Sequence, residues 1–509
     1  MNTDQSNFFD SVCKQARRAA LLQSAAETLE WDERTGMPPK ASEYRAQQIS
    51  TLNAMVHELR TDETYGENLE SLSQQIDTSQ PNDIAATVRG LTRDWRRNRK
   101  LPTDLVKRIS TARVRGQQVW DESRRADDFA IFAPVLKEMV SLQRESGDRM
   151  AEGTDRDAYG ALLDTYEPDA KTAELQQVFD ELRTPLVQLI AEIRDAPRQP
   201  KIEILERDFP VDAQKRFSRW VAEQIGFDFQ RGRLDETSHP FCTTLGPHDC
   251  RILSRYESNW LPGGLFGTMH EAGHGMYEQG LRTDDWFGLP PGSYGSLGIH
   301  ESQSRLWENQ IGRSRSFWRW LYPHAQNYFS SSLSGVDPED FFFAINTIRP
   351  SLIRVEADEA TYNLHILIRF DLEQALINGT LSVADLPEAW NERYRSDLGI
   401  TPPSDADGVL QDVHWSAGLF GYFPTYTLGN VISAQLHDAA AEQLGDLDAM
   451  FAQGNFQPLL QWLRENVHTH GQCLSQTDLV KQTTGASLSA TSLIEYLRSK
   501  LRPLYGLTG

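Results

Sequence analysis

Two histidines four positions apart are the residues with the clearest chemical potential in this chain. The segment TMHEAGHGM contains His270 and His274, with Glu271 directly after the first. At about 100° per residue, both imidazoles leave one face of a helix within roughly 40° of each other and can reach a single ion. Neutral imidazole nitrogen suits Zn²⁺. Glu271 points away from that face, so we expect it to take a proton from a water that the ion has acidified, as in the HExxH pattern of metallopeptidases.

A catalytic zinc site needs a third protein ligand, and HExxH alone is short enough to occur by chance. Glu301, in the segment GIHESQSR, is the predicted third ligand, because a loop rich in Gly and Pro at 288–298 separates it from the first helix. His300 and Glu308 compete for the same role, and an exposed Glu301 is the alternative without a metal. Two histidines and a carboxylate also tolerate Co²⁺ or Mn²⁺.

The element that must hold the two histidines is predicted to be a helix that begins after 262–264 and ends near Gly280. Glycines at 267, 273 and 275 each cost about 1 kcal/mol relative to alanine, which indicates that another element approaches this helix closely. One apolar stripe can pack into the protein. Its members are Leu265, Met269, Ala272 and Met276.

Most of the remaining chain has apolar residues at three- and four-residue spacing, which predicts a mostly α protein. The main predicted helices are 4–30, 43–60, 101–125, 132–150, 172–194, 350–378 and 440–465. Two short strands are predicted at 201–209 and 250–256. A chain of 509 residues is longer than the length that a single hydrophobic core usually supports. We therefore expect one unit over 1–509 with two lobes, and a lobe boundary near 195–210, where the segment RDAPRQPK has turn chemistry.

Composition excludes several classes of protein. The net charge of −21 argues against nucleic-acid binding, which needs clustered excess Lys and Arg. The four cysteines form no CxxC pair, which favours reduced thiols. We expect no signal peptide and no membrane span, since there is neither an apolar leader behind a basic start nor a run of 18 apolar residues. A cytoplasmic location is the resulting prediction.

Further segments resemble, in the same order, the motifs of the carboxypeptidase Taq family of metallocarboxypeptidases. The resemblance extends over nearly the whole chain, and Leu253 is a departure, because it replaces the threonine of DxRxT. Besides HExxH, the matching segments are the N-terminal WDERTGMPPKASEYRAQQISTL at 31–52, HPF at 239–241, DxRxT at 249–253, HES/GQ at 300–303, I/VRxxAD at 353–358, GxxQDxHW at 408–415 and GYFPTYTLG at 421–429.

The resemblance implies a helical, two-lobed metallopeptidase with a long central cleft and a small β-sheet near the active site. It implies a homodimer that removes C-terminal residues from peptides with broad specificity, supported by zinc or cobalt. By the same resemblance, His270, His274 and Glu301 are the metal ligands, and Glu271 is the general base and acid.

An enzyme that removes only the last residue must recognise a free carboxylate, which a guanidinium binds through paired, charge-assisted hydrogen bonds. Arg354 is the first candidate for this role and Arg251 the second. The alternative for each is an internal ion pair, with Asp358 and Asp249 as the partners nearest in sequence.

Three residues are candidates to donate a hydrogen bond to the oxyanion of a tetrahedral intermediate: Tyr422, Tyr426 and His414. Each is equally compatible with a packed core side chain. His239 is expected in the cleft wall or behind the ligands rather than at the scissile bond. Two other functions stay open: an endopeptidase or dipeptidyl carboxypeptidase that uses the same metal helix, and a helical binding protein without activity.

Overall fold

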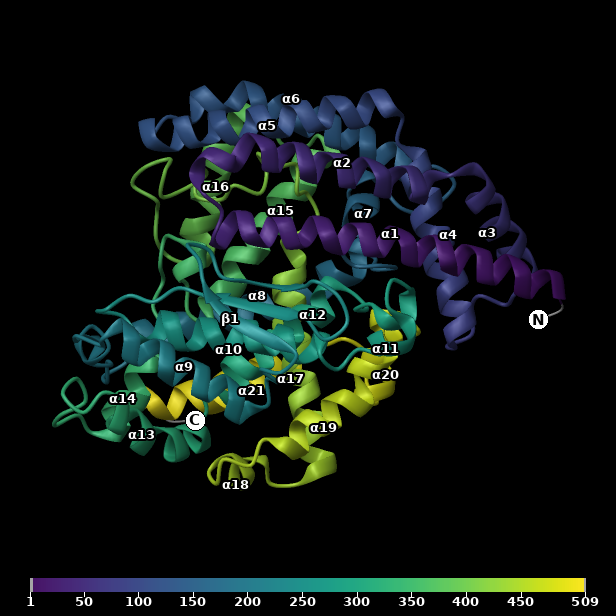
Figure 1. The fold of residues 1–509 in the computed structure, drawn as a ribbon. Coiled ribbons are helices and arrows are strands. Elements are labelled where there is room, and N and C mark those ends of the chain that lie inside the picture. Colours follow the sequence, from purple (N-terminus) through teal and green to yellow (C-terminus); the bar gives the residue numbers. More distant parts are fainter. Residues whose placement is uncertain (1–2, 508–509) are drawn as a thin grey trace. The chain divides into compact units, whose positions relative to one another are not determined.

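The computed structural model describes residues 3–507 and consists mainly of helices, as the sequence predicts (Figure 1). Within the described part, the chain divides into two compact units, each assembled from three separate stretches. Unit 1 runs up to Arg99 and includes Lys201–Ile345 and Leu436–Gly485. Unit 2 includes Lys100–Pro200, Asn346–Gln435 and the stretch from Ala486 onward. None of the helices in the described part is long and apolar enough to cross a membrane.

Unit 1 contains the small sheet and the helices around it. Its helices are α1 (Thr3–Thr35), α2 (Ser42–Thr61), α3 (Glu63–Gln75), α9 (Val211–Ile225), α10 (Leu261–Glu278), α11 (Thr283–Trp286), α12 (Leu297–Arg305), α13 (Arg315–Tyr328), α14 (Pro338–Ile345), α18 (Leu447–Phe451), α19 (Gln457–Asn466) and α20 (Gln476–Thr484). Its short helical turns are η1 (Pro39–Ala41), η2 (Ile202–Ile204), η3 (Pro290–Gly292), η4 (Leu306–Ile311) and η7 (His468–His470).

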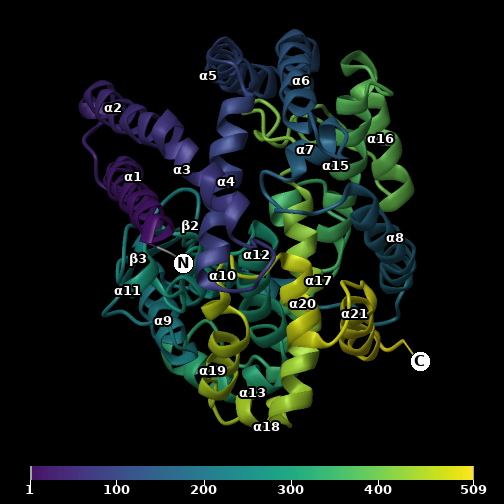
Figure 2. The ribbon, with the colours of Figure 1, turned by 90° about the vertical axis from the view of Figure 1, so that its right-hand side faces the viewer.

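Unit 2 has helices and no strand in its described part, with α5 and α6 packed along each other (Figure 2). Its elements are α5 (Thr103–Ala126), α6 (Phe129–Ala151), α7 (Ala158–Leu163), α8 (Thr172–Arg194), η5 (Arg354–Glu356), α15 (Thr361–Asn378), η6 (Val383–Asp385), α16 (Leu386–Asp397) and α21 (Thr491–Leu504). Two further helices, α4 (Asp83–Lys100) and α17 (Pro424–Leu444), contain the points at which one unit ends and the other begins.

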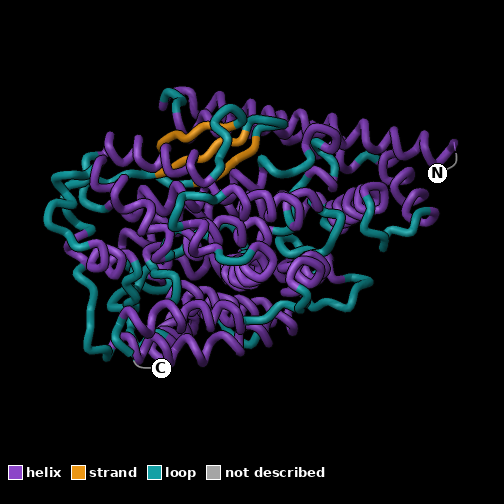
Figure 3. The backbone as a smooth tube through the Cα atoms, turned by 90° about the horizontal axis from the view of Figure 1, so that it is seen from below, coloured by secondary structure: helices purple, strands orange, loops and turns teal. Residues whose placement is uncertain are grey.

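The sheet consists of β1 (Gly232–Glu236), β2 (Phe241–Thr244) and β3 (Cys250–Ser254), in the order β1-β3-β2 (Figure 3). The central strand β3 pairs in parallel with β1 and antiparallel with β2. The strand predicted at 250–256 is therefore confirmed, whereas β1 and β2 are short and too polar to be recognised from alternation.

The strand predicted at 201–209 is wrong, because the structure has the 3₁₀ turn η2 there. Ile204, the last residue of the turn, and Leu205, which follows it, are both buried, whereas a strand would place adjacent side chains on opposite faces. The amide of Leu205 donates to the carbonyl of Ile202, so the local backbone bonds are satisfied within the turn.

Two predicted helices are shorter than expected. The helix predicted at 350–378 begins only at Thr361, where the Asp358 carboxylate accepts hydrogen bonds from the backbone of residues 360 and 361. The helix predicted at 440–465 is interrupted, because Gly445 and Gly454 adopt φ values of 88° and 72°. Such left-handed conformations end a helix and favour glycine.

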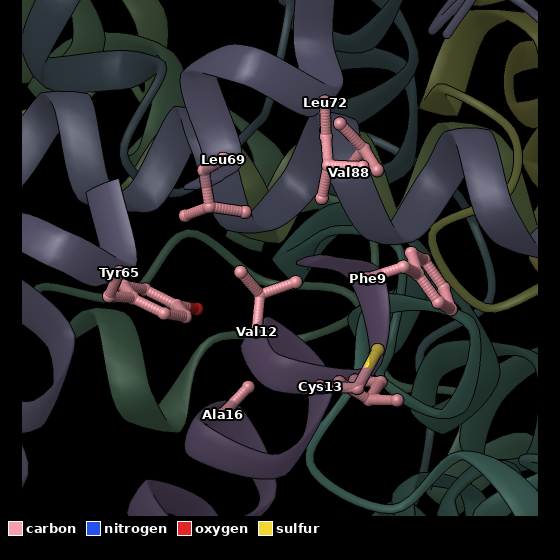
Figure 4. Close-up of a cluster of buried hydrophobic side chains, with 9 residues drawn as sticks. Phe9, Val12, Cys13, Ala16, Tyr65, Leu69, Leu72 and Val88 are labelled. Atoms are coloured by element: carbon pink, nitrogen blue, oxygen red, sulfur yellow. The ribbon is translucent and has the colours of Figure 1, made fainter. Parts of the chain in front are cut away.

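The N-terminal helices of unit 1 share an apolar core (Figure 4). It unites residues of α1 at three- and four-residue spacing with residues of α3 and α4. Farther along α1, the guanidinium of Arg251 in β3 lies 4.2 Å from the Trp31 ring centroid, so the same helix is also attached to the sheet. The labelled members are Phe9, Val12, Cys13, Ala16, Tyr65, Leu69, Leu72 and Val88.

Helix α10, which carries HExxH, is buried among β3, α9 and α12. The predicted apolar stripe is confirmed, since each of its four members is at most 1% exposed. The helix begins at Leu261, earlier than predicted, because Pro262 is compatible with a first helical turn that needs no amide donor. It ends at Glu278, close to the predicted end.

Of the glycines at 267, 273 and 275, two are required by close contacts. A Cβ at Gly273 would lie 2.6 Å from the carbonyl oxygen of Gln303 and 2.7 Å from the Cα of Ser304, both in α12. A Cβ at Gly275 would lie 2.5 Å from the ring of Phe227. At Gly267 the nearest atom would be 3.6 Å away, an ordinary contact, so the predicted close approach does not extend to this residue.

We therefore predict opposite effects of alanine at two positions of one helix. Gly273→Ala forces α10 and α12 apart and lowers the free energy of unfolding by about 1–3 kcal/mol, the usual cost of overpacking. Gly267→Ala serves as the control, because it gains helix propensity of up to about 1 kcal/mol without a clash. Urea unfolding of both variants checks this, and equal stabilities would contradict the contact at Gly273.

Candidate active site

The structure brings His270, His274 and Glu301 together in unit 1. One ligand atom from each lies within 4.8 Å of the others. The Nε2 atom of His274 is 3.3 Å from Oε2 of Glu301, and the Nε2 atom of His270 is 3.6 Å from the same oxygen. Glu301 is 6% exposed, so its alternative interpretation as an exposed helix residue is wrong.

The Nδ1 atoms of both histidines are occupied by hydrogen bonds that orient the rings. His270 donates through Nδ1 to Oε2 of Glu308 at 2.9 Å, and Nδ1 of His274 lies 3.0 Å from the backbone carbonyl of His300. This leaves Nε2 of each ring facing Glu301. Such partners fix the tautomer and orientation of histidines that bind metals. Glu308 and His300, which competed with Glu301 as ligands, thus contact the opposite side of the rings.

Glu301 is oriented in turn by its neighbours. The guanidinium of Arg305 donates to Oε1 at 2.7 Å, and the hydroxyl of Ser304 donates to Oε2 at 3.0 Å. The strong hydrogen bond from Arg305 holds one carboxylate oxygen away from the histidines. Oε2 is consequently the oxygen presented to them.

Glu308 lies in the π-helical turn η4, which directly follows α12. Single π-helical turns are rare in proteins, but those that occur are frequently found at functional sites. The Glu308 carboxylate contacts Arg305 at 3.2 Å and Arg313 at 3.6 Å in addition to His270. Sequence analysis did not identify Arg305 or Arg313, since nothing in the residue pattern distinguishes a π turn from an α turn.

A further carboxylate links α10 to the sheet. Glu278, at the end of α10, lies 2.9 Å from Nε2 of His300 and accepts a hydrogen bond from the hydroxyl of Thr244 in β2 at 3.0 Å. The rings of His300 and His274 have their centroids 4.4 Å apart. Glu278 therefore fixes the ring of the HES/GQ histidine, a role that the sequence alone did not indicate.

Burial and charge shift the protonation of the site. Burial favours the neutral form of Glu301, but Arg305 and His270 outweigh it and hold the pKa of this carboxyl well below its usual range. Burial, with a contribution from His300, lowers the pKa of His274 to about 3. An ionised carboxylate and a neutral imidazole thus point lone pairs toward each other.

This donor set fits a divalent metal ion. Two imidazole nitrogens and one carboxylate oxygen are the protein ligands of catalytic zinc sites, which keep one position open. Acceptor atoms that meet in a buried place, with their other atoms already hydrogen-bonded, favour a cation between them. Glu271, next to His270 on α10, is 6% exposed, and burial raises its pKa to about 7 despite the charge of His270.

In unit 2, three of the motifs named above meet around Asp412. The Nε atom of Arg354 donates to Oδ1 of Asp412 at 2.9 Å, and the Nε atom of Arg369 donates to Oδ2 at 2.7 Å. The partner of Arg354 is therefore Asp412, and the sequence-based alternative of Asp358 is wrong, because Asp358 caps α15 instead. The two arginines hold the pKa of Asp412 well below its usual range against the effect of burial.

The predicted aromatic candidates lie beside this ion pair. The Arg354 guanidinium is 5.3 Å from the ring centroid of Tyr426, whose ring packs edge-on against Tyr422. The ring of His414 lies 5.6 Å from that of Tyr422. Burial lowers the pKa of His414 to about 4, although Asp412 opposes the shift, so the imidazole is neutral at physiological pH.

The remaining candidates belong to the sheet of unit 1. Asp249 and Arg251 form a two-pronged ion pair, with both N–O distances at 2.9 Å, and the guanidinium also stacks on Trp31. His239 is exposed in the turn before β2. Leu253 is fully buried in β3, so the position that holds threonine in the family motif is an apolar core position in this chain.

Comparisons with known proteins agree with this geometry. The family described as Carboxypeptidase Taq (M32) metallopeptidase matches residues 11–501. Thermostable carboxypeptidase 1 of Thermus thermophilus is 44% identical over 98% of this chain and 99% of that protein, and carboxypeptidase 1 of Bacillus subtilis is 37% identical over 99% of each. The crystal structure of an M32 carboxypeptidase from Deinococcus radiodurans R1 superposes with a TM-score of 0.94 at 38% identity, covering 98% of this chain and 100% of that one.

These likenesses extend over the full length of the relatives, so they define the class of the protein as a metallopeptidase. The chain belongs to the carboxypeptidase Taq (M32) family.

Glu373 supports the loop that carries the unit 2 candidates. Its buried carboxylate accepts hydrogen bonds from Trp415 Nε1 at 2.9 Å and from the Gly421 amide and the Tyr159 hydroxyl at 3.0 Å each. Burial raises its pKa to about 7, although these donors oppose the shift.

Because the folded pKa of Glu373 is above its ordinary value, protonation favours the folded state. This contribution is complete below the unfolded pKa and is lost as the pH rises toward 7. We predict that, between pH 5 and pH 8, wild type loses up to about 3 kcal/mol more unfolding free energy than Glu373→Gln. Urea unfolding at both pH values tests this, with Glu356→Gln as a control at an exposed glutamate of the same unit. A pH-independent difference would contradict the assignment.

Proposed function

We propose that this protein is a zinc-dependent carboxypeptidase that hydrolyses the C-terminal peptide bond of peptides with broad specificity. The observation that carries the proposal is the convergence of one atom each from His270, His274 and Glu301 within 4.8 Å, in a member of the M32 family. In this proposal, Nε2 of each histidine and Oε2 of Glu301 hold the metal ion. The same donors would also accept Co²⁺ or Mn²⁺.

When bound, the ion supplies a Lewis acid that polarises the scissile carbonyl and acidifies a water molecule. The chain's own contribution at this point is proton transfer by Glu271. A carboxylate whose pKa lies at about 7 accepts a proton from the attacking water and returns it to the leaving amine near neutral pH. Glu271 is therefore proposed as the general base and acid.

Arg354 is proposed to bind the terminal carboxylate of the substrate, on the basis of local charge. Arg354 and Arg369 share the single carboxylate of Asp412, and neutral His414 adds no charge, so two guanidinium groups face one paired carboxylate. Arg369 is fully buried, whereas Arg354 is 5% exposed. By contrast, Asp249 neutralises Arg251 completely, so Arg251 is the weaker candidate.

The other candidates keep supporting roles in the proposal. Tyr422, Tyr426 and neutral His414 are proposed as hydrogen-bond donors to the substrate, a function in which preorganised donors contribute about 3–4 kcal/mol. Asp249 is proposed to orient Arg251, and His239 to contact peptide substrates at the edge of the sheet. We also propose a cytoplasmic homodimer in which 1–509 acts as one peptidase unit.

The metal assignment gives a direct prediction. His274→Ala removes one of three ligands, so the purified variant should lose bound zinc and all hydrolysis. Glu271→Gln keeps the ligands and loses the proton carrier, so it should retain the metal with hydrolysis lowered by about 10²–10⁴-fold or more. Elemental analysis and rate measurements, with and without chelator, test both variants. Full activity of Glu271→Gln would refute the mechanism.

Exopeptidase action is tested with one peptide prepared both as the free acid and as the C-terminal amide. We predict sequential release of single amino acids from the free acid and little cleavage of the amide, because the amide cannot form a charged pair with a guanidinium. Equal cleavage of both, or release of dipeptides, would instead favour the endopeptidase or dipeptidyl carboxypeptidase alternative.

Arg354→Lys should raise KM for the free acid by about 10- to 100-fold, because an ammonium keeps the charge but loses the paired hydrogen bonds. Arg251→Lys is the matched comparison, and we expect it to change KM less. The reverse order would transfer the carboxylate-binding role to Arg251.

A further inference from the structure

His468 is a buried histidine in unit 1, far in sequence from the motifs described above. It lies in η7 and is 1% exposed. Its Nε2 atom donates a hydrogen bond to Oε1 of Gln303 at 2.9 Å. Gln303 belongs to α12 and follows the ligand Glu301 by two positions.

The same imidazole contacts the end of the other ligand helix. A Cβ at Gly280 would overlap the ring of His468 at Nδ1, so the backbone that follows α10 lies directly against the ring. The ring of Tyr277, in the last turn of α10, has its centroid 5.1 Å from that of His468. One side chain thus touches both elements that provide metal ligands.

Gln303 transmits this contact into α12. Its side-chain amide donates to the hydroxyl of Ser302 at 3.1 Å, and that hydroxyl donates to the carbonyl of Ile299 at 2.6 Å. The backbone carbonyl of Gln303 lies against Gly273 of α10. The position of Gln303 therefore decides how closely α12 approaches the histidine pair, and His468 holds its side chain.

The chemistry of His468 indicates positioning rather than stabilisation. Burial lowers its pKa to about 3, so the ring is neutral and donates only through Nε2. Among the described residues, Nδ1 has no hydrogen-bond partner. A buried nitrogen without a partner is unfavourable, so a phenyl ring would pack in this place at least as well. What a phenyl ring lacks is the directed bond to Gln303.

We propose that His468 is a positioning residue of the metal site, which sets the spacing between α10 and α12 and thereby the affinity for the metal ion. The inference rests on the proposed metal site. The residue acts through Gln303 and touches neither the metal ligands nor the reacting atoms. Its loss should therefore weaken metal binding more than it lowers turnover at saturating metal.

The test compares Zn²⁺ affinity, measured by competition with a chromophoric chelator, in wild type and His468→Phe. Phe keeps the ring against Gly280 and removes the donor. We expect Zn²⁺ to bind about 10–100-fold more weakly, as for other partners of metal ligands, with kcat at saturating Zn²⁺ within about threefold of wild type. His468→Gln, which restores an N–H donor of similar reach, should recover part of the affinity.

Tyr322→Phe is the matched control. It also removes one buried hydrogen bond in unit 1, from the Tyr322 hydroxyl to the carbonyl of Val336, in α13, a helix that provides no proposed metal ligand. It should leave Zn²⁺ affinity unchanged. Gln303→Met removes the acceptor from the other side, so the double variant with His468→Phe should bind Zn²⁺ no more weakly than the weaker single variant. The single variant Gln303→Met also provides the test if His468→Phe does not fold.

Wild-type affinity in His468→Phe, or an equal loss in Tyr322→Phe, would overturn the positioning role while leaving the proposed function intact. Additive losses in the double variant would also overturn it. If wild type itself binds no Zn²⁺ and hydrolyses no peptide, the proposed function and this inference both fail.

Discussion

The close approach of α12 to the backbone of α10 is the constraint on which the proposed metal site depends. Two histidines on one helix can point at the same place, but a third ligand must come from another element, and a carboxylate reaches only a short distance. Gly273 has no side chain, and any Cβ at this position would force the two helices apart. The cost is an intrinsically weaker helix. Burial of α10 on nearly every side compensates for it, since the tertiary structure and not helix propensity keeps this segment folded.

Buried charged side chains are paired differently in the two units. In unit 1, the carboxylates of Glu301 and Glu308 both contact Arg305, and Glu308 also contacts Arg313, so two carboxylates face two guanidinium groups. In unit 2, Arg354 and Arg369 share the single carboxylate of Asp412. Buried charges are costly unless they are paired, and the unequal pairing around Asp412 supports the proposal that an anionic group of the substrate binds there.

Features that depend on local periodicity can be predicted from the sequence. The angular relation of His270 and His274 follows from helix geometry alone, and the apolar stripe of α10 was recognised for the same reason. The prediction of Glu301 also depended on the loop at 288–298, which is long enough for the chain to return to the HExxH helix. What could not be predicted depends on distant residues or on backbone irregularity. Asp412 is separated from Arg354 in sequence by the helices α15 and α16 and a long loop, and the π turn that contains Glu308 has no residue signature. Glu373 reads as an ordinary helix residue until the fold surrounds its carboxylate with donors.

The assembly of each unit from three separate stretches has a consequence for the order of folding during synthesis. The chain leaves the ribosome from its N-terminus, and unit 1 receives its last stretch, Leu436–Gly485, only after most of unit 2 has been made. The proposed metal ligands are therefore synthesised long before the segment that contains His468, which contacts Tyr277 of α10 and Gln303 of α12. At that stage the growing chain contains His270, Glu271, His274 and Glu301, but it lacks the contacts that His468 makes with the two helices. In a protein proposed to cut peptides, this order delays a fully formed site until the stretch Leu436–Gly485 has been made.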